Sequence, residues 1–277
     1  MKNPIQSSKI KGIKIIYNDP LEMIENFVDE KNIRNGFCVK IWKDGRKFKG
    51  YYLNNKINGW ANLIRLDFDL KGDFCDDILN GYGELVDFEE NKIFKGYWIN
   101  GKLGGIGIEF GSDYKYFGCF INKVKNGYGK QIWTDNDVYE GSYKDGLFNG
   151  YGIYYFKNGD QYIGEWKNNE KCGFGEQIYS NGQKYMGYFK DDKKDGFGIY
   201  CFSEDTFSLN FWKKGKRYGL GKYIKGNNIN FSIWEENKKI QNINENDFMK
   251  KIIETKKNYL SLFKWSINEI NKFINNK

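Results

Sequence analysis

Apolar and polar residues alternate with period two over most of the chain. In residues 138–144, Tyr139, Gly141 and Tyr143 fall on one face and polar side chains fall on the other. This period predicts strands with one face exposed to water. Asp145-Gly146, which follows, suits a tight turn because both residues tolerate positive φ. The pattern therefore predicts short antiparallel hairpins.

The hairpins belong to a sequence repeat of 22–24 residues, marked by two landmarks. One is a triplet with glycine at both ends and an aromatic or aliphatic residue between them. The other is a glycine flanked by aromatic residues, nine positions before the triplet. Seven units hold both landmarks if Ala61 is accepted for glycine, and a half-unit with Gly36 precedes them. An eighth copy at 207–221 departs from the pattern, with Ser208 and Asn210 at the tyrosine and glycine positions.

Glycine inside these strands has a structural explanation. It normally weakens a strand, but it is tolerated where a large group lies against the backbone. We expect an aromatic ring from the neighbouring strand to lie across each bare glycine. This packing accounts for both landmark residue types without a ligand.

The motif Tyr-x-Gly-x-Trp, followed by Gly-x-Gly on this period, resembles the MORN repeat. Tyr162, Gly164 and Trp166 with Gly173 and Gly175 form one good copy, and the resemblance covers about residues 34–240. It implies a mainly β fold, an elongated single-layer antiparallel meander of about eight hairpin repeats. Because such arrays contact only nearest neighbours, their ends need protection.

Residues 1–33 precede the repeats and are expected to cap the first sheet edge. Alternation over 13–17 predicts a strand. Asp19 as N-cap and Pro20 at the next position predict a short helix after it. The apolar face of that helix would hold Leu21, Ile24, Phe27 and Val28.

Residues 241–277 change to a helical period and predict a long C-terminal amphipathic helix over 244–275, capped by Asn244. The candidate partner-binding residues are the apolar stripe Met249, Ile253, Leu260, Phe263, Ile267, Ile270 and Ile274. Three alternatives stay open for this stripe. It folds back over the aromatic face of its own sheet, pairs with a helix of another chain (a homodimer included), or lies on an anionic membrane.

Composition excludes much chemistry. The chain has no histidine, which removes imidazole acid–base catalysis and histidine-ligated metals. Five widely separated cysteines form no CxxC, and the acidic residues lie at turns, so we expect no metal, cofactor or enzymatic activity. The net charge of +8 comes from lysine, with only four arginines. Lysine lacks the bidentate fork of arginine, so we do not expect nucleic acid as a partner.

The resemblance to MORN proteins without a catalytic domain implies a scaffold for protein–protein interactions. Such proteins are typical of cytoskeletal assemblies, ciliary and axonemal ones among them, and of membrane–cytoskeleton junctions. We therefore expect a cytoplasmic, cytoskeleton-associated protein, with the cilium among the candidate settings, that docks through its sheet and terminal helix. The alternative is a membrane adaptor that binds anionic phospholipids or phosphoinositides through lysine.

Overall fold

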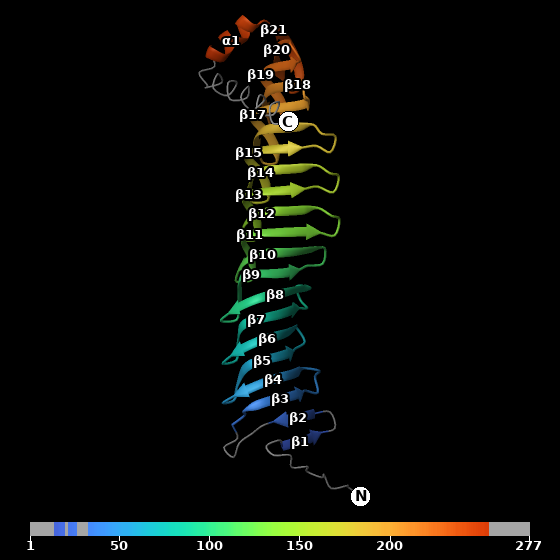
Figure 1. Cartoon of the computed structure of the whole chain (residues 1–277), viewed down its shortest axis with the longest axis vertical. Coiled ribbons are helices and arrows are strands. Elements are labelled where there is room, and N and C mark those ends of the chain that lie inside the picture. Colours follow the sequence, from blue (N-terminus) through green and yellow to red (C-terminus); the bar gives the residue numbers. More distant parts are fainter. Residues whose placement is uncertain (1–13, 20–21, 27–32, 255–277) are drawn as a thin grey trace. The chain divides into compact units, whose positions relative to one another are not determined.

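A computed structural model describes residues 14–19, 22–26 and 33–254, and the chain divides into two compact units, residues 1–134 and 135–277. Within each unit, consecutive strands pair antiparallel in chain order (Figure 1). The predicted meander is therefore confirmed inside both units. Its hairpins form because most segments of period-two alternation are followed by residues that adopt positive φ; Asp145 and Gly146 have φ of 51° and 82°.

The first unit contains eleven strands among its described residues. They are β1 (Lys14–Asp19), β2 (Glu22–Asn26), β3 (Gly36–Ile41), β4 (Lys47–Leu53), β5 (Lys56–Ile64), β6 (Phe68–Cys75), β7 (Ile78–Asp87), β8 (Lys92–Ile99), β9 (Lys102–Phe110), β10 (Tyr114–Ile121) and β11 (Val124–Trp133).

The second unit contains ten strands and a helix within its described part. They are β12 (Val138–Lys144), β13 (Leu147–Tyr155), β14 (Gln161–Lys167), β15 (Glu170–Ile178), β16 (Lys184–Lys190), β17 (Lys193–Ser203), β18 (Thr206–Lys213), β19 (Lys216–Lys225), β20 (Asn228–Glu235), β21 (Lys238–Ile243) and α1 (Glu245–Glu254).

The predicted N-terminal strand is confirmed, but the predicted helix after it is wrong. Residues 22–26 form strand β2, which pairs with β1 on one side and with β3 on the other. Ile24 lies opposite Lys40, and Glu25 lies opposite Val39. Backbone pairing to an open strand edge has outweighed the local capping signal at Asp19 and Pro20. The other residues of the predicted apolar face lie outside the described residues.

The strands contain a recurring β-bulge that the alternation did not predict. Gly141 pairs with Gly152, whereas Tyr143 pairs with Phe148, so three residues of β13 lie opposite one residue of β12. The first triplet glycine, Gly150, lies in this bulge with φ of 103°. A bulge bends its strand and increases the local twist. The triplet therefore begins with glycine because the bend requires positive φ there.

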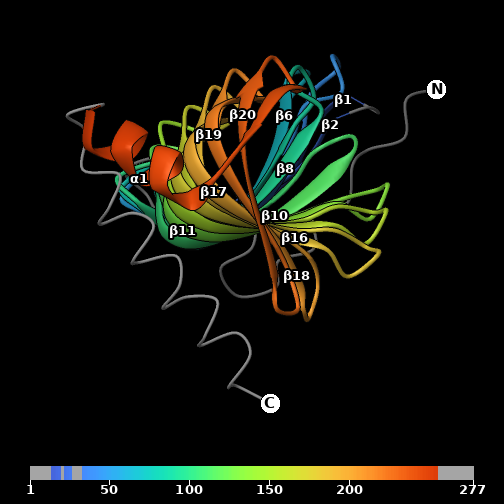
Figure 2. The same cartoon turned by 90° about the horizontal axis from the view of Figure 1, so that it is seen from above.

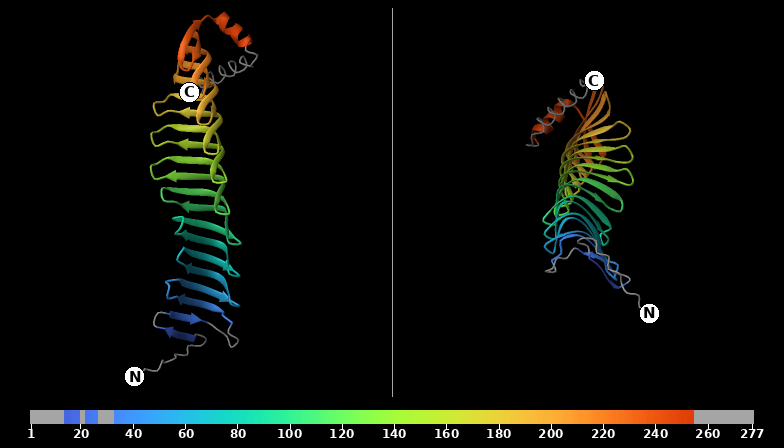
Figure 3. Two further views of the ribbon diagram at one scale, coloured as in Figure 1. Left: turned by 180° about the vertical axis from the view of Figure 1, so that it is seen from behind. Right: turned by 60° about the horizontal axis from the view of Figure 1, so that its bottom comes forward.

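The C-terminal helix is confirmed over α1, and the rest of its predicted stretch lies outside the described residues. Asn244 caps it as predicted, because its Oδ1 accepts a hydrogen bond of 2.9 Å from the backbone N–H of Asp247. In the second unit α1 lies beside the last strands of the sheet (Figures 2 and 3). No helix of the described residues has the length and apolar character needed to span a membrane.

Candidate functional site

A ladder of buried tyrosines lies on one face of the sheet in the second unit, and one tyrosine holds the same position in the first; we call this side of the sheet the tyrosine face. Tyr162 lies over the glycine pair Gly164 and Gly175, which are opposite each other on β14 and β15. A Cβ added to Gly164 would lie 2.8 Å from Cζ of Tyr162 and 2.7 Å from Cα of Gly175. The tyrosines in this position are fully buried, namely Tyr116 in the first unit and Tyr139, Tyr162 and Tyr185 in the second. The predicted packing of rings on glycine is confirmed, with one difference: each ring covers a glycine of its own strand as well as one of the next strand.

Hydrogen bonds donated by the tyrosine hydroxyl and the tryptophan indole stabilise a bend of the strands. The hydroxyl of Tyr162 donates to the backbone carbonyl of Glu165, three residues further along, at 3.1 Å. Carbonyl groups of a flat strand point sideways within the sheet, so this bond requires β14 to turn toward the tyrosine face. The indole N–H of Trp166 donates to the carbonyl of Gly152 at 3.3 Å. The tyrosine face is therefore the inner side of the bend, filled by its own repeat residues.

A row of cations extends along the tyrosine face of the second unit, at the position two residues before each triplet. Lys171, Lys194 and Arg217 hold this position in three consecutive repeats. Lys194 lies over rings whose centroids are 4.4–5.6 Å from its Nζ: Tyr179, Tyr185, Tyr200 and Trp212. Burial, and then the neighbouring charges of Lys171 and Arg217, lower the pKa of Lys194 to about 8. No carboxylate of the described residues lies within ion-pair distance of Lys194.

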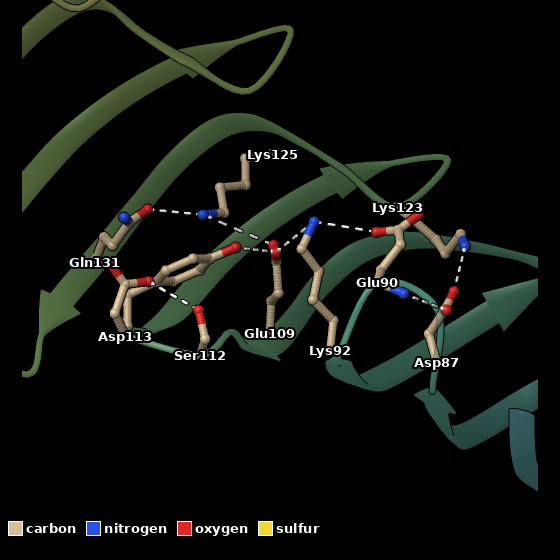
Figure 4. A network of polar contacts seen from close by, with 10 residues as sticks. Asp87, Glu90, Lys92, Glu109, Ser112, Asp113, Lys123, Lys125 and Gln131 are labelled. Carbon is tan, nitrogen blue, oxygen red and sulfur yellow. Dashed lines mark hydrogen bonds and ion pairs between the residues drawn. The ribbon is translucent and has the colours of Figure 1, made fainter.

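The equivalent cation of the first unit is neutralised by carboxylate (Figure 4). Lys125 lies 3.7 Å from the buried Glu109 and donates a 2.7 Å hydrogen bond to Gln131. Glu109 also accepts from the Tyr114 hydroxyl and lies 3.7 Å from Lys92. Burial still lowers the pKa of Lys125 to about 8, against the opposing effect of Glu109. The same repeat position thus differs between the units: the charge of Lys125 is compensated by Glu109, whereas the half-buried Lys194 has no carboxylate beside it among the described residues.

The opposite face presents the middle residue of each triplet, and we call this row the triplet stripe. In the first unit its members Trp60, Tyr82, Ile106 and Tyr128 are all exposed. In the second unit Tyr151 is 60% exposed, but Phe197 and Leu220 are 2% and 7% exposed. The difference comes from α1, whose Phe248 and Ile252 belong to the same buried cluster as Phe197 and Leu220. The helix therefore covers the end of the triplet stripe.

The structure divides the predicted partner-binding residues. Met249 and Ile253 lie in α1 and point away from the cluster, 37% and 71% exposed. The remaining predicted residues, Leu260, Phe263, Ile267, Ile270 and Ile274, lie outside the described residues. The helix packs on its own sheet, but on the face opposite the tyrosine face. Sequence reasoning missed Phe248 and Ile252, although they lie one helical turn apart and are both apolar.

These features define a protein built of tandem β-hairpin repeats with two chemically distinct faces. The family model of the MORN repeat matches residues 30–45, 94–114, 116–138, 139–161, 162–184, 185–206 and 211–228. The matches cover more than half of the chain, so it belongs to the MORN-repeat family. Seven segments match, where the sequence predicted about eight repeats. Residues 46–93 are not matched, yet their hairpins keep the repeat register, with Gly72 opposite Gly83.

Comparison with known proteins adds little about function. No curated protein matches the sequence significantly. Among solved structures, the TCP10 domain of Danio rerio CPAP, in complex with a STIL peptide, is 8% identical with a TM-score of 0.45, covering 79% of this chain and 97% of that one. The TCP domain of Drosophila melanogaster SAS-4, in complex with a proline-rich motif of Ana2, is 12% identical with a TM-score of 0.26, covering 77% and 98%. Both TM-scores are below 0.5, so the likeness does not identify a function for this chain.

Proposed function

We propose that this MORN-repeat protein is a non-enzymatic scaffold that binds protein partners through the triplet stripe and the outer side of α1. The observation that supports it most is the contact between α1 and the end of the stripe. There, Phe248 and Ile252 cover Phe197 and Leu220, while Tyr151 earlier in the same unit is exposed. A surface that binds one amphipathic helix in its last repeats is suited to bind another along the repeats before them.

The spacing of the stripe fits such a helix. Tyr151 and Phe174 lie on β13 and β15, so two strand spacings, about 9.6 Å, separate them. Seven residues of an α-helix rise about 10.5 Å. A partner helix aligned with the stripe would thus bring one apolar side chain per heptad to each triplet residue. Exposed aromatic rows of this kind mark interaction sites more often than solvent-facing surface.

We place the partner in a cytoskeletal assembly, axonemal or ciliary ones included, and the protein in the cytoplasm. Support for this setting is the membership of the MORN family together with the lack of a catalytic motif in the sequence. Met249 and Ile253 extend the proposed surface on α1, because they are apolar and exposed on the side away from the sheet. Leu260, Phe263, Ile267, Ile270 and Ile274 would continue it.

Affinity recovery from native extract with the immobilised full chain tests the proposal. Tyr151→Lys and Ile253→Lys should each remove cytoskeletal partners, because a charge would be buried in an apolar contact. Leu147→Lys is the matched control, since Leu147 is exposed on the same strand but lies outside the stripe. Each recovered protein is then purified, and its affinity for the natural chain and for each of the three variants is measured directly.

Two results would contradict the scaffold. Equal recovery of every partner by Tyr151→Lys and Leu147→Lys would remove the triplet stripe as the binding surface. Binding of phosphatidylserine vesicles that is lost in high salt, with no protein partner recovered, would favour the membrane adaptor. Sedimentation of the purified full chain separately reports whether the partner is a second copy.

A further inference from the structure

The tyrosine face of the second unit has a hollow in the repeat at residues 207–221, the copy that departs from the repeat pattern. A pocket of about 470 Å³ opens between β18 and β21 and is lined by Ser208, Asn210, Arg217, Ser232, Trp234 and Lys239, among others. None of its lining residues is acidic. The pocket is separate from the triplet stripe, because its serine and tryptophan side chains belong to the opposite face of the sheet.

The pocket exists because two repeat residues have been replaced. Ser208 stands where Tyr185 stands one repeat earlier, and Asn210 stands where Gly187 does. The strand register is kept, since Asn210 pairs with Gly221 as Gly187 pairs with Gly198. The tyrosine ring of the neighbouring repeat is therefore missing here, and the indole of Trp234 lies over Gly221, with its Nε1 2.8 Å from the position of an added Cβ. The replacement also leaves the Oδ1 atom of Asn210 buried with no hydrogen-bond partner among the described residues, which is unfavourable for the fold.

Positive charge faces this hollow. The guanidinium of Arg217 lies 3.8 Å from the ring centroid of Trp234, and no described residue accepts a hydrogen bond from it. Burial lowers the pKa of Arg217, but arginine stays charged at any physiological pH. Lys239 adds a second charge, and Lys194 continues the row of cations one repeat away. Hydroxyl and amide groups of Ser208, Ser232 and Asn210 supply polar walls.

We propose that this pocket binds the phosphate group of a phosphorylated side chain on an extended peptide segment of a partner protein. The planar fork of Arg217 matches two phosphate oxygens, and its stacking on Trp234 holds the fork in place. Two unneutralised cations match the charge of −1.5 to −2 that a phosphate monoester carries at neutral pH. A carboxylate side chain would satisfy Arg217 but would leave Lys239 without a counter-charge.

The surroundings favour a peptide over a lipid headgroup. The pocket lies on the inner side of a bent sheet, where a flat bilayer surface cannot follow it. Asn230 and Asn242 lie in the wall of the pocket and offer amide groups, which are partners for the N–H and C=O groups of an extended backbone. Lys194 lies two strands from Arg217, about 9.6 Å, close to three residues of an extended chain. An acidic residue three positions from the phosphorylated residue of the peptide would contact Lys194.

Fluorescence anisotropy with a labelled glycine–serine peptide that contains one phosphoserine tests the site. Matched peptides carry serine or glutamate at that position. The full chain should bind the phosphopeptide at least about tenfold more tightly than either, since only a dianion matches the charges of both Arg217 and Lys239. Arg217→Met should weaken binding about 10- to 100-fold, the range expected for lost hydrogen bonds to a charged group. Lys190→Met, an exposed lysine of β16, is the charge-matched control and should bind as the natural chain does.

The decisive variant combines Ser208→Tyr with Asn210→Gly, which restores the residues of the neighbouring repeat. The ring should fill the hollow, abolish phosphopeptide binding and raise the urea midpoint of unfolding, so that loss of binding cannot be ascribed to misfolding. Unchanged affinity in this variant would overturn the proposal, as would equal affinity for the serine peptide. Binding of phosphoinositide vesicles that depends on Arg217, without binding of the phosphopeptide, would overturn the choice of a peptide. Tyr151→Lys should leave phosphopeptide binding intact, which separates this site from the triplet stripe.

Discussion

Alanine at Gly118 should be far more damaging than alanine at an ordinary strand position. Gly118 lies opposite Gly129, and the Tyr116 ring lies over both. An added Cβ would lie 2.5 Å from Cα of Gly129 and 2.7 Å from Cζ of Tyr116. Real Cβ contacts essentially never come under 3.0 Å, and one of these neighbours is backbone, which cannot move aside without separating the strands.

The magnitude follows from overpacking. Extra methyl groups forced into a filled interior typically cost about 1–3 kcal/mol, and a backbone clash belongs at the upper end of this range. We therefore expect Gly118→Ala to lower the free energy of unfolding of the first unit by about 3 kcal/mol. Gly104→Ala is the matched control on the adjacent strand β9, because its Cβ would meet nothing within 4 Å. That substitution should be neutral, or should stabilise by up to about 1 kcal/mol through the unfolded chain.

Urea unfolding and native-state hydrogen exchange measure the effect. Repeat arrays need not unfold in one step, so amide exchange in β10 and β11 reports the local change directly. Tyr116→Leu combined with Gly118→Ala should recover only part of the loss, since the contact with Gly129 persists. Equal unfolding midpoints and equal exchange rates for Gly118→Ala and Gly104→Ala would refute the interpretation of the glycines as space for rings.

Three further predictions concern the second unit. Tyr162→Phe should cost about 1 kcal/mol in unfolding free energy, because its hydroxyl no longer bonds the Glu165 carbonyl; hydrogen exchange in β14 checks it. Phe248→Ala should cost about 3–4 kcal/mol locally and uncover Phe197, whereas Ile253→Ala should cost less than about 0.5 kcal/mol, as exchange in β17–β20 would reveal. Unfolding free energy should rise from pH 8 to pH 10, because folded Lys194 loses its proton near pH 8 and unfolded lysine keeps it to about pH 10.4. Lys194→Met should reduce that rise by up to about 1 kcal/mol, as urea titrations at each pH would measure. Above pH 10 the unfolding free energy should fall with pH, because burial raises the pKa of Tyr185 in the folded chain.

Local periodicity was enough to predict the hairpins, because both faces of each strand are specified by residues close in sequence. The ring of Tyr162, the glycine it covers on its own strand and the facing glycine of β15 lie within fourteen residues, so the repeat contains its own packing partners. The bulge at Gly150 escaped prediction because glycine in a strand is compatible with either a ring or a bend. In this repeat both explanations apply: Gly150 lies in the bulge with positive φ, and Gly152 lies under the ring of Tyr139.

Contacts that join distant segments could not be predicted in the same way. The capping signal at Asp19 and Pro20 predicted a helix, whereas residues 22–26 form a strand because β2 pairs with β3. In α1 two apolar stripes lie side by side, and either could have faced the sheet. Phe248 is buried because its ring packs against Phe231, with centroids 4.6 Å apart, and joins the buried cluster of the stripe residues, a contact that only the folded sheet reveals.

Departures from the repeat are of two kinds, and the difference bears on function. In the first unit Leu70 and Phe94 replace the ladder tyrosine, and Leu79 and Leu103 then lie over the glycines of those repeats, with methyl carbons 2.9 Å from the positions of an added Cβ. The interior stays filled, so these replacements preserve the fold. At Ser208 the compensation differs: Trp234 lies over the glycine of this repeat, with its Nε1 2.8 Å from the position of a Cβ added to Gly221, and Arg217 stacks on Trp234 without a counter-charge among the described residues. A departure that leaves a hollow and a charge without a partner is unfavourable for folding alone. The phosphate that we propose for that pocket would give the charge of Arg217 its partner.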